Sequence, residues 1–243
     1  MRRVALVTGG AIRIGRALSL GLAEAGYDVV VNYHSSGGAA REVVRQVEAM
    51  GRRGVAVQAD VSRPDEVRDL AGDVKEVFGR LDLLVNSAAT FRATPLLEIE
   101  EREWDQVMGV NLKGPFLTVQ ALAPLLKEAG GMVLNIVDLG AFEPWTRHPH
   151  HAVSKAGLLH LTRIMARVLA PSVRVNAIAP GTVLPPDEMD REARERDERR
   201  TPLGAVGSPE DVVRTALFLA GSPFITGEVV VVDGGRALGK GEG

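Results

Sequence analysis

Short apolar runs alternate along the chain with longer amphipathic stretches. The apolar runs lie at residues 4–7, 28–33, 54–59, 81–85, 132–137, 173–178 and 228–232. Between them, apolar residues recur at spacings of three and four, as in Ile14, Ala17, Leu18 and Leu22, which is typical of helices. Strands that alternate with helices indicate a parallel sheet covered on both faces. We therefore expect a doubly wound, Rossmann-type α/β fold with about seven strands.

The first apolar run ends abruptly at Thr8-Gly9-Gly10, and a helical pattern begins a few residues later. In an α/β sheet, such a turn directs the N–H groups of a helix N-terminus toward an anion, and the helix dipole adds to the attraction. Glycines 9, 10 and 15 lack the Cβ atom that would keep a ligand at a distance. We interpret this turn as a dinucleotide phosphate site. An ordinary strand-to-helix turn that happens to carry glycine is the alternative.

Composition narrows the class of protein. The 243 residues fit one domain, 1–243, and 45% of them are hydrophobic. The formal charge of -2 argues against a nucleic-acid surface, which needs a basic excess. The absence of cysteine excludes disulfides and thiolate catalysis, and no apolar run is long enough to span a bilayer. We expect a cytoplasmic protein that binds neither nucleic acid nor membrane.

From Thr8 to Gly235 the order of motifs resembles the short-chain dehydrogenase/reductase family. The first turn matches the family pattern T-G-x-x-x-G-x-G, except that Arg13 stands where a small residue is usual. This variant is similar to the pteridine reductase branch of the family. The resemblance implies a nicotinamide cofactor, a small-molecule substrate and a homotetramer. In this turn it implies cofactor contacts from Thr8, Gly9, Arg13, Ile14 and Gly15.

The residues after the second strand indicate which cofactor is used. They read Asn32-Tyr33-His34-Ser35-Ser36, and no acidic residue occurs before Glu42. In dinucleotide folds an acidic residue at this point holds the ribose of NAD and repels the 2′-phosphate of NADP. We therefore predict NADPH, with donors to the phosphate from His34, Ser35 and Ser36 and with Arg13 as a nearby cation. A polar loop without this task is the alternative.

The resemblance implies further cofactor contacts along the chain. They are Asp60 and Val61 at the adenine, Asn86, Ser87 and Ala88 beside the ribose, and Pro180, Gly181 and Val183 at the nicotinamide carboxamide. Asp60 is equally well suited to cap the helix that begins near Pro64.

The catalytic chemistry is expected between the fifth strand and the following helix. Asp138 follows the strand, and His151 and Lys155 are four residues apart, so they share one face of a helix. The family places Ser, Tyr and Lys at these three positions, and it uses an Asn in the context of Asn111 to hold a water through a local helix distortion. Asp138 in place of Ser is again typical of pteridine reductases, whereas His151 in place of Tyr departs from both patterns.

Reduction of a C=O or C=N bond requires a proton as well as a hydride. An imidazole titrates near neutral pH, and a neighbouring carboxylate keeps it charged. We predict that Asp138 and His151 deliver the proton and that Lys155 holds the nicotinamide ribose. Loss of the acid, which leaves a silent cofactor-binding protein, is the alternative. The stretch His-Pro-His-His at 148–151 lacks the spacing of a metal site, so no metal is predicted.

Phe91 lies in a polar, turn-rich stretch after the fourth strand, at the sheet edge where such folds bind ligands. Its ring either stacks on a bicyclic substrate or covers the core. Pteridine reductases carry Phe in this setting, and the resemblance adds Arg13, Asp138 and His151 to the substrate site. We expect reduction of a pterin-like C=N bond. Reduction of a ketone such as a 3-oxoacyl thioester, and catalytic silence, are the alternatives.

A heavily charged run, Asp187 to Arg200, lies within residues 184–207 and contains few apolar side chains. The position of this region in the family indicates a substrate lid, and a plain exposed helix fits the sequence equally well. Ser208-Pro209 then predicts the start of the next helix, with a serine N-cap and a proline at the first helical position.

Overall fold

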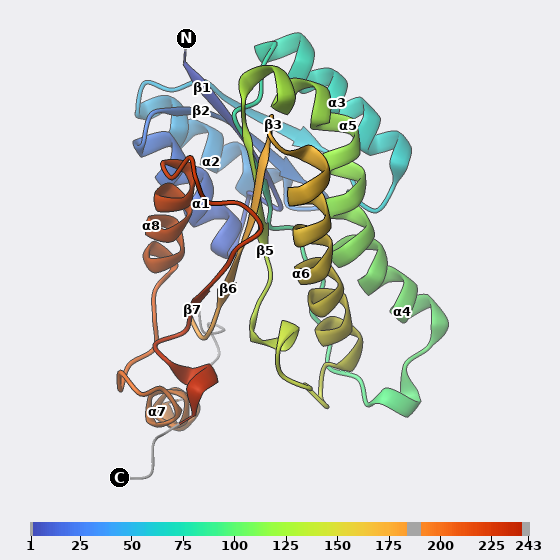
Figure 1. Cartoon of the computed structure of the whole chain (residues 1–243), viewed down its shortest axis with the longest axis vertical. Helices are drawn as coiled ribbons and strands as arrows, with labels where there is room; N and C mark the ends of the chain where they lie inside the picture. The colour runs from blue at the N-terminus through green and yellow to red at the C-terminus, as the bar shows by residue number, and fades with distance from the viewer. Residues whose placement is uncertain (1, 184–190, 240–243) are drawn as a thin grey trace.

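One seven-stranded parallel sheet forms the centre of the computed structural model, which describes residues 2–183 and 191–239 (Figure 1). The strand order is β3-β2-β1-β4-β5-β6-β7. The strands are β1 (Arg3–Thr8), β2 (Tyr27–Tyr33), β3 (Gly54–Gln58), β4 (Leu83–Asn86), β5 (Met132–Ile136), β6 (Arg174–Pro180) and β7 (Val229–Val232). The predicted doubly wound α/β fold is confirmed. Because the strand order reverses between β1 and β4, a crevice opens there at the carboxyl ends of the strands.

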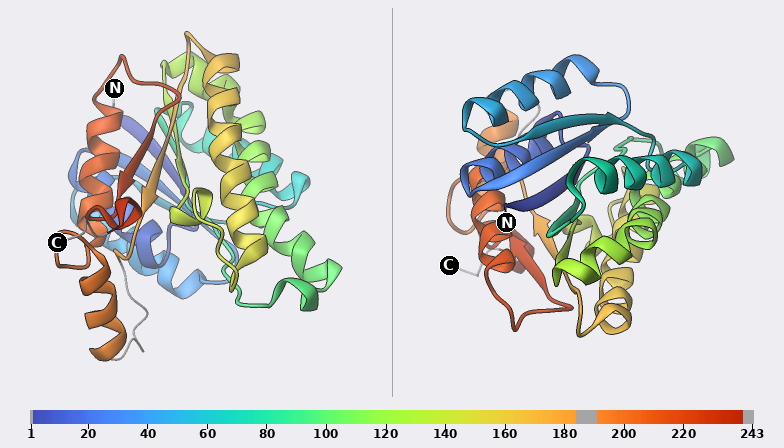
Figure 2. Two further views of the ribbon diagram at one scale, coloured as in Figure 1. Left: turned by 60° about the horizontal axis from the view of Figure 1, so that its bottom comes forward. Right: turned by 90° about the horizontal axis from the view of Figure 1, so that it is seen from above.

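Helices cover both faces of the sheet, as Figures 1 and 2 show. One layer contains α1 (Arg13–Glu24), α2 (Gly37–Ala49) and α8 (Pro209–Ala220). The other contains α3 (Pro64–Phe78), α5 (Gly114–Ala129) and α6 (Pro149–Leu169), with α4 (Glu101–Met108) packed against α6. No helix in the described part of the chain is long and apolar enough to cross a bilayer.

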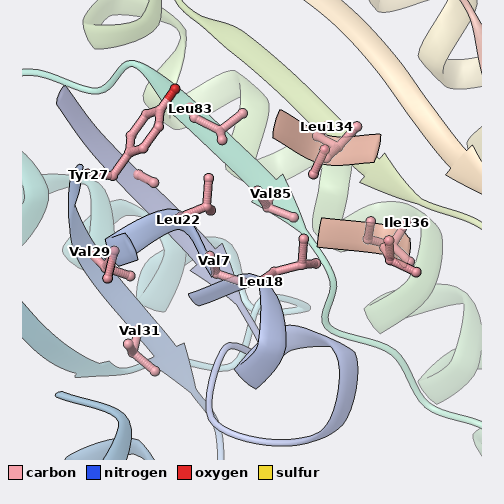
Figure 3. Packing of buried hydrophobic residues seen from close by; sticks show 14 of the residues in the cluster. Val7, Leu18, Leu22, Tyr27, Val29, Val31, Leu83, Val85, Leu134 and Ile136 are labelled. Atoms are coloured by element: carbon pink, nitrogen blue, oxygen red, sulfur yellow. The ribbon is translucent and has the colours of Figure 1, made fainter. Parts of the chain in front are cut away.

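The apolar face of α1 closes one side of the sheet (Figure 3). Leu18 and Leu22 are fully buried, and they share a hydrophobic cluster with Val7, Val31 and Val85 of three neighbouring strands. Full burial of one such side chain contributes roughly 1.5–3 kcal/mol. Because these strands are covered on both faces, they are nearly continuous apolar runs rather than alternating ones. This rigid layer fixes the end of β1, and with it the glycine turn that follows.

The region that carries Asn111 is not one continuous α-helix. It consists of α4, a π-helical turn at Gly109–Lys113 and α5. The π-helical turn agrees with the local helix distortion that the family resemblance implies around Asn111. Helix α6 begins at Pro149, because a proline suits the first turn of a helix, where its missing N–H has no partner to lose.

Only part of the predicted lid lies among the described residues. Residues 184–190 fall outside them, whereas Arg191–Arg200 form helix α7, which lies beyond one end of the sheet in Figure 1. This part of the charged run is therefore helical, and its role as a substrate lid stays a prediction. Helix α8 starts at Pro209 as predicted, and Ser208 and Asp211 form a capping box there.

Candidate active site

The glycine turn after β1 is packed so tightly that side chains are excluded. A Cβ atom on Gly15 would lie 2.1 Å from the carbonyl oxygen of Gly9. Gly9 itself has φ of +61°, and a Cβ atom there would lie 2.9 Å from the Cα atom of Ala88. The hydroxyl oxygen of Thr8 accepts hydrogen bonds from the N–H groups of Ser87 at 3.0 Å and Ala88 at 3.1 Å. The turn, the start of α1 and the end of β4 thus form one rigid cradle.

A cleft of about 280 Å³ opens beside this cradle, at the carboxyl ends of β1, β2 and β4. Its lining includes the predicted cofactor residues Gly9, His34, Ser35, Ser36, Asp60, Val61 and Ala88. Asn32 links the glycine turn to the residues that follow β3. Its backbone carbonyl accepts from Gly10 N at 2.9 Å, and its side-chain amide donates to the carbonyl of Ala59 at 3.1 Å. The cleft is large enough to hold part of a dinucleotide.

Arg13 begins α1 in the left-handed conformation, with φ of +51°. For a residue other than glycine this conformation costs roughly 1–3 kcal/mol and persists only where the surrounding structure demands it. The side chain of Arg13 is exposed, while its neighbour Ile12 lines the cleft. The strained residue therefore lies next to the predicted cofactor site.

Asp60 does not cap α3. The N-cap residue of that helix is Arg63, and the Asp60 carboxylate instead accepts hydrogen bonds from the backbone N–H of Ser62 at 2.9 Å and from its hydroxyl at 2.7 Å. The N-cap interpretation of Asp60 is therefore wrong, because the chain makes one further turn before the helix begins. Its predicted contact with adenine stays a prediction.

The side chain of Asn86 is directed into the protein interior. Its amide nitrogen donates to Oδ1 of Asn135 at 2.9 Å, and its oxygen accepts from the hydroxyl of Thr118 at 2.8 Å. Asn135 in turn donates to the hydroxyl of Thr162 at 2.9 Å. The structure therefore does not bring the Asn86 side chain to the predicted ribose position, because it joins β4, β5 and α5 instead. Ala88 lines the cleft, so this end of β4 still faces it.

Asp138 and His151 form a hydrogen-bonded pair where β5 ends and α6 begins. The distance from Nε2 of His151 to Oδ2 of Asp138 is 2.6 Å. The other carboxylate oxygen accepts from the backbone N–H of Gly140 at 2.9 Å, which fixes its orientation. The side chain of His151 is 3% exposed and that of Asp138 is 21% exposed. The carboxylate is therefore the side of the pair that solvent reaches.

The surroundings keep Asp138 ionised. Burial raises the pKa of Asp138, but the hydrogen bond from His151 and the charge of Lys155 outweigh this effect and hold the pKa below its ordinary value. At neutral pH a carboxylate therefore faces Nε2, and Nε2 carries a hydrogen that it donates to Asp138.

The other ring nitrogen of His151 faces the protein interior. Nδ1 lies 3.2 Å from the carbonyl oxygen of Thr90 and 3.3 Å from Nδ2 of Asn111. A hydrogen on Nδ1 donates to the carbonyl of Thr90 in the charged imidazole and also in the neutral imidazole that has given up its Nε2 proton. Both protonation states of the ring thus have partners, which is what a group that gives up and regains a proton requires.

Asn111 holds the loop that follows β4 in place. Within the π-helical turn it is fully buried, its Oδ1 accepts from Thr90 N at 2.7 Å, and its Nδ2 donates to Thr90 O and Ser154 Oγ, both at 3.0 Å. The predicted residue thus contacts His151, and Ser154 is a partner that the sequence did not reveal. Turns of this π type occur frequently at functional sites.

Lys155 is buried on the same face of α6 as His151, as the spacing predicts. Its Nζ donates to the carbonyl of Ile136 at 2.8 Å. Burial lowers the pKa of Lys155, and the charge of Asp138 opposes that shift. The segment at the end of β5 thus provides a hydrogen-bond partner for each of the two α6 residues: Ile136 for Lys155, and Asp138 for His151.

Aromatic rings surround the histidine. The Phe91 ring lies nearly perpendicular to that of His151 at a centroid distance of 4.7 Å, and the ring of Trp145 lies parallel to that of His151 at 6.1 Å. His148 stacks on Phe91 at 4.1 Å. Because Phe91 is 58% exposed and belongs to none of the buried clusters, the alternative that it covers the core is wrong. Trp145, one of two tryptophans, is a site residue that the sequence reasoning missed.

The three neighbouring histidines face three different partners. His151 faces Asp138, the Nδ1 of His148 donates to the carbonyl of Arg92 at 2.7 Å, and Nε2 of the buried His150 lies 3.1 Å from Oε1 of Glu103. Within residues 2–183 and 191–239, no three His, Asp or Glu side chains converge as metal ligands.

The turn after β6 lies against the end of β7. Gly181 N donates to the carbonyl of Val232 at 2.9 Å, and a Cβ atom on Gly181 would lie 2.7 Å from that of Asp233. Val183 is buried in the cluster against which Ile14 of α1 packs. The turn predicted to contact nicotinamide, Pro180 to Val183, is thus held between β7 and the α1 layer.

Comparisons with known proteins agree with this architecture. Residues 10–237 match the protein family described as Enoyl-(Acyl carrier protein) reductase. The 3-oxoacyl-(acyl-carrier-protein) reductase of Staphylococcus aureus is 37% identical over 244 residues, which cover 98% of this chain and 99% of the relative. That of Synechocystis is 39% identical and covers 97% of each. The crystal structure of acetoin dehydrogenase from Enterobacter cloacae superposes with a TM-score of 0.90 at 33% identity, covering 99% of this chain and 97% of that one.

Proposed function

The chain belongs to the short-chain dehydrogenase/reductase family, and we propose that it is an NADPH-dependent carbonyl reductase whose substrate class is the 3-oxoacyl thioesters. The observation that carries this proposal is the similarity, over nearly the full length, to 3-oxoacyl-(acyl-carrier-protein) reductases of two organisms. This similarity favours carbonyl reduction. The motifs around Arg13, Phe91 and Asp138 instead favour reduction of a pterin-like C=N bond.

The cradle and the cleft fit a dinucleotide. The glycine turn leaves no room for side chains at Gly9 and Gly15, so backbone N–H groups can approach a pyrophosphate closely. His34, Ser35 and Ser36 line the cleft without an acidic side chain among them, which suits the 2′-phosphate of NADPH. When bound, NADPH supplies the hydride. We assign Lys155 to the nicotinamide ribose.

The protein supplies the proton. Charged His151 donates from Nε2 to Asp138 and from Nδ1 to the carbonyl of Thr90. The Nε2–H bond breaks, the proton passes by way of the Asp138 carboxylate to the substrate oxygen, and the ring, now neutral, keeps its Nδ1–H bond to Thr90. Asp138, the more exposed partner, then carries a proton from solvent back to Nε2. Asn111 holds Thr90 and so keeps the imidazole oriented throughout.

A second candidate is reduction of a pterin-like ring, which rests on Phe91. Its ring is 58% exposed and lies 4.7 Å from His151, so a flat heterocycle that stacks on it would lie next to the proton donor. A flexible acyl chain needs no such ring. Pterin reduction therefore requires the Phe91 ring, whereas reduction of a 3-oxoacyl thioester does not.

A substrate panel tests the proposal. NADPH absorbance is followed with a 3-oxoacyl thioester, acetoin, a dihydropterin and a quinonoid dihydropterin. We expect the highest kcat/KM with the thioester. A preference for either pterin would replace the proposal with the second candidate. Turnover of none of them, with NADPH binding intact, would identify a silent dinucleotide-binding protein.

A further inference from the structure

The segment Thr90–Thr94, which carries Phe91, has no helix or strand of its own and is held from outside. All three histidines of the stretch 148–151 contribute to this attachment. His151 lies 3.2 Å from the carbonyl of Thr90, and His148 donates to that of Arg92 at 2.7 Å. His150 contacts Glu103, whose carboxylate accepts from the hydroxyl of Thr94 at 2.6 Å.

His148 differs from the other two because it contacts Phe91 directly. Its ring stacks on that of Phe91 with an interplanar angle of 27°, and its Nδ1 binds the carbonyl of the following residue, Arg92. As the residue just before α6, it makes no capping hydrogen bond with its side chain. The orientation of this ring is therefore set by Phe91 and Arg92.

An exposed phenylalanine on an irregular segment has several rotamers open to it. One face of the Phe91 ring is covered by His148, and the ring of His151 lies nearly perpendicular to it at a centroid distance of 4.7 Å. These two contacts restrict the rotamers of Phe91, which is still 58% exposed and so available to a ligand. They also hold the ring beside the proton-donating imidazole.

We propose that His148 is a positioning residue for substrate binding: its stacked ring and its hydrogen bond to Arg92 hold Phe91 as the wall of the substrate site beside His151. This inference rests on the proposed function, since it gives Phe91 a substrate to contact. His148 holds the Phe91 ring and takes no part in the proton transfer from His151. Its loss therefore weakens substrate binding more than it slows the chemical step. Apolar or planar parts of the substrate are those that this wall selects.

Two substitutions separate the two contacts. His148→Phe keeps a ring for stacking and removes the donor to Arg92, whereas His148→Asn keeps a donor near the position of Nδ1 and removes the ring. His148→Ala removes both. We expect His148→Ala to raise KM about three- to tenfold, the range of an aromatic pair, with kcat changed less than about twofold. Each single-contact variant should lie between His148→Ala and the wild type.

A double-mutant cycle with Phe91→Leu identifies the route of the effect. If His148 acts through Phe91, then His148→Ala adds nothing to the KM of Phe91→Leu. Additive changes in KM, or a loss of kcat without a change in KM, would overturn the proposal. His160→Ala is the matched control, because His160 is an exposed histidine on the same helix, α6, and should leave both constants unchanged.

Fluorescence tests the same cycle without substrate. Trp145 lies 6.4 Å from both Phe91 and His148, and Trp104→Phe makes it the sole tryptophan. In that background we expect His148→Ala to shift the emission, and to cause no further shift when it is added to Phe91→Leu. An emission change by His148→Ala that is equally large with and without the Phe91→Leu substitution would overturn the positioning role. If the wild type reduces nothing in the substrate panel, the proposed function fails while this measurement still decides whether His148 positions Phe91.

Discussion

The imidazole of His151 is enclosed by protein, and its Nε2 lies 2.6 Å from the partly exposed carboxylate of Asp138. The pair thus has one end in the interior, at the carbonyl of Thr90, and one end toward solvent. A tyrosine in place of His151 would need a cation to become acidic, whereas an imidazole is an acid near neutral pH and needs an anion to stay charged. This chain has Asp138 where the family has serine, and His151 where the family has tyrosine. The two differences are chemically consistent, because the carboxylate of Asp138 is the anion that a charged imidazole needs.

Removing the imidazole should remove most of the proton transfer. We expect His151→Phe to lower kcat by about 10²- to 10⁴-fold, the usual contribution of a general acid, and to leave NADPH binding unchanged. Absorbance at saturating NADPH measures the first quantity, and a fluorescence titration with NADPH measures the second. Undiminished turnover by His151→Phe would exclude His151 from the mechanism.

Asp138 should make the folded state less stable as the pH falls into the acid range. Its pKa is lower in the folded state than in the unfolded chain, so its contribution is present above the unfolded value of about 3.9 and is lost as pH falls through the folded pKa. We expect the Tm difference between wild type and Asp138→Asn to be constant from pH 6 to about pH 5 and to shrink from there toward pH 3. A difference that is constant all the way from pH 6 to pH 3 would contradict the shift. Asp73→Asn, at an exposed site on α3, is the control.

The glycine cradle should tolerate no side chain. Gly15→Ala places a Cβ atom 2.1 Å from the carbonyl oxygen of Gly9, so we expect a Tm several degrees lower and the loss of NADPH binding. Gly72→Ala is the matched control, since Gly72 lies inside α3 with no atom within 4 Å of its Cβ position. There we expect about 0.5–1 kcal/mol of stabilisation from the better helix former. Differential scanning fluorimetry with and without NADPH measures both variants, and equal behaviour of the two would contradict the close packing.

The Asn86 amide should act on stability rather than on cofactor affinity. Asn86→Ala leaves Oδ1 of the buried Asn135 without its donor, which we expect to cost about 1–3 kcal/mol in the free energy of unfolding, whereas the Thr118 hydroxyl keeps the carbonyls of Gly114 and Pro115. Urea unfolding measures this loss. The double variant Asn86→Ala/Thr118→Val should cost less than the sum of the two single changes. A large rise in the Kd for NADPH with unchanged stability would instead assign Asn86 to the cofactor.

The cofactor preference should respond to a charge after β2. His34→Asp places a carboxylate at an exposed position of the cleft lining, where it repels a 2′-phosphate and suits a free ribose. We expect the ratio of kcat/KM for NADPH to that for NADH to fall about tenfold. His34→Asn, which adds no charge, is the control. An unchanged ratio would place the phosphate elsewhere.

Local patterns in the sequence were sufficient to predict the strands, the glycine turn and the pairing of Asp138 with His151. Each depends on spacing along one element or on the rule that the ends of parallel strands share an edge. The direction of the Asn86 side chain was not predictable in this way, because it is set by Thr118 and Asn135 on two other elements. The roles of Trp145 and His148 likewise arise from contacts between distant loops.

Substrate class is the point at which motifs and overall similarity diverge. Arg13, Phe91 and Asp138 resemble three residues of the pteridine reductase branch, whereas the similarity to 3-oxoacyl-(acyl-carrier-protein) reductases extends over nearly all residues. Most of that similarity lies in a sheet and cofactor cradle that many substrates share. Side chains that line the substrate site, such as Phe91, therefore have to be tested individually.

Asn86 and Asn135 occupy directly paired positions of β4 and β5, beside strand residues that are otherwise almost all aliphatic. A shift of two residues between such strands keeps the same faces buried, so hydrophobicity alone barely distinguishes one alignment from the next. A shifted pairing would enclose an amide with no partner, a penalty of about 1–3 kcal/mol per group. We therefore expect this polar pair to disfavour misaligned pairings of β4 and β5 during folding, so that the cost of replacing it would appear in the yield of correctly folded protein as well as in its stability.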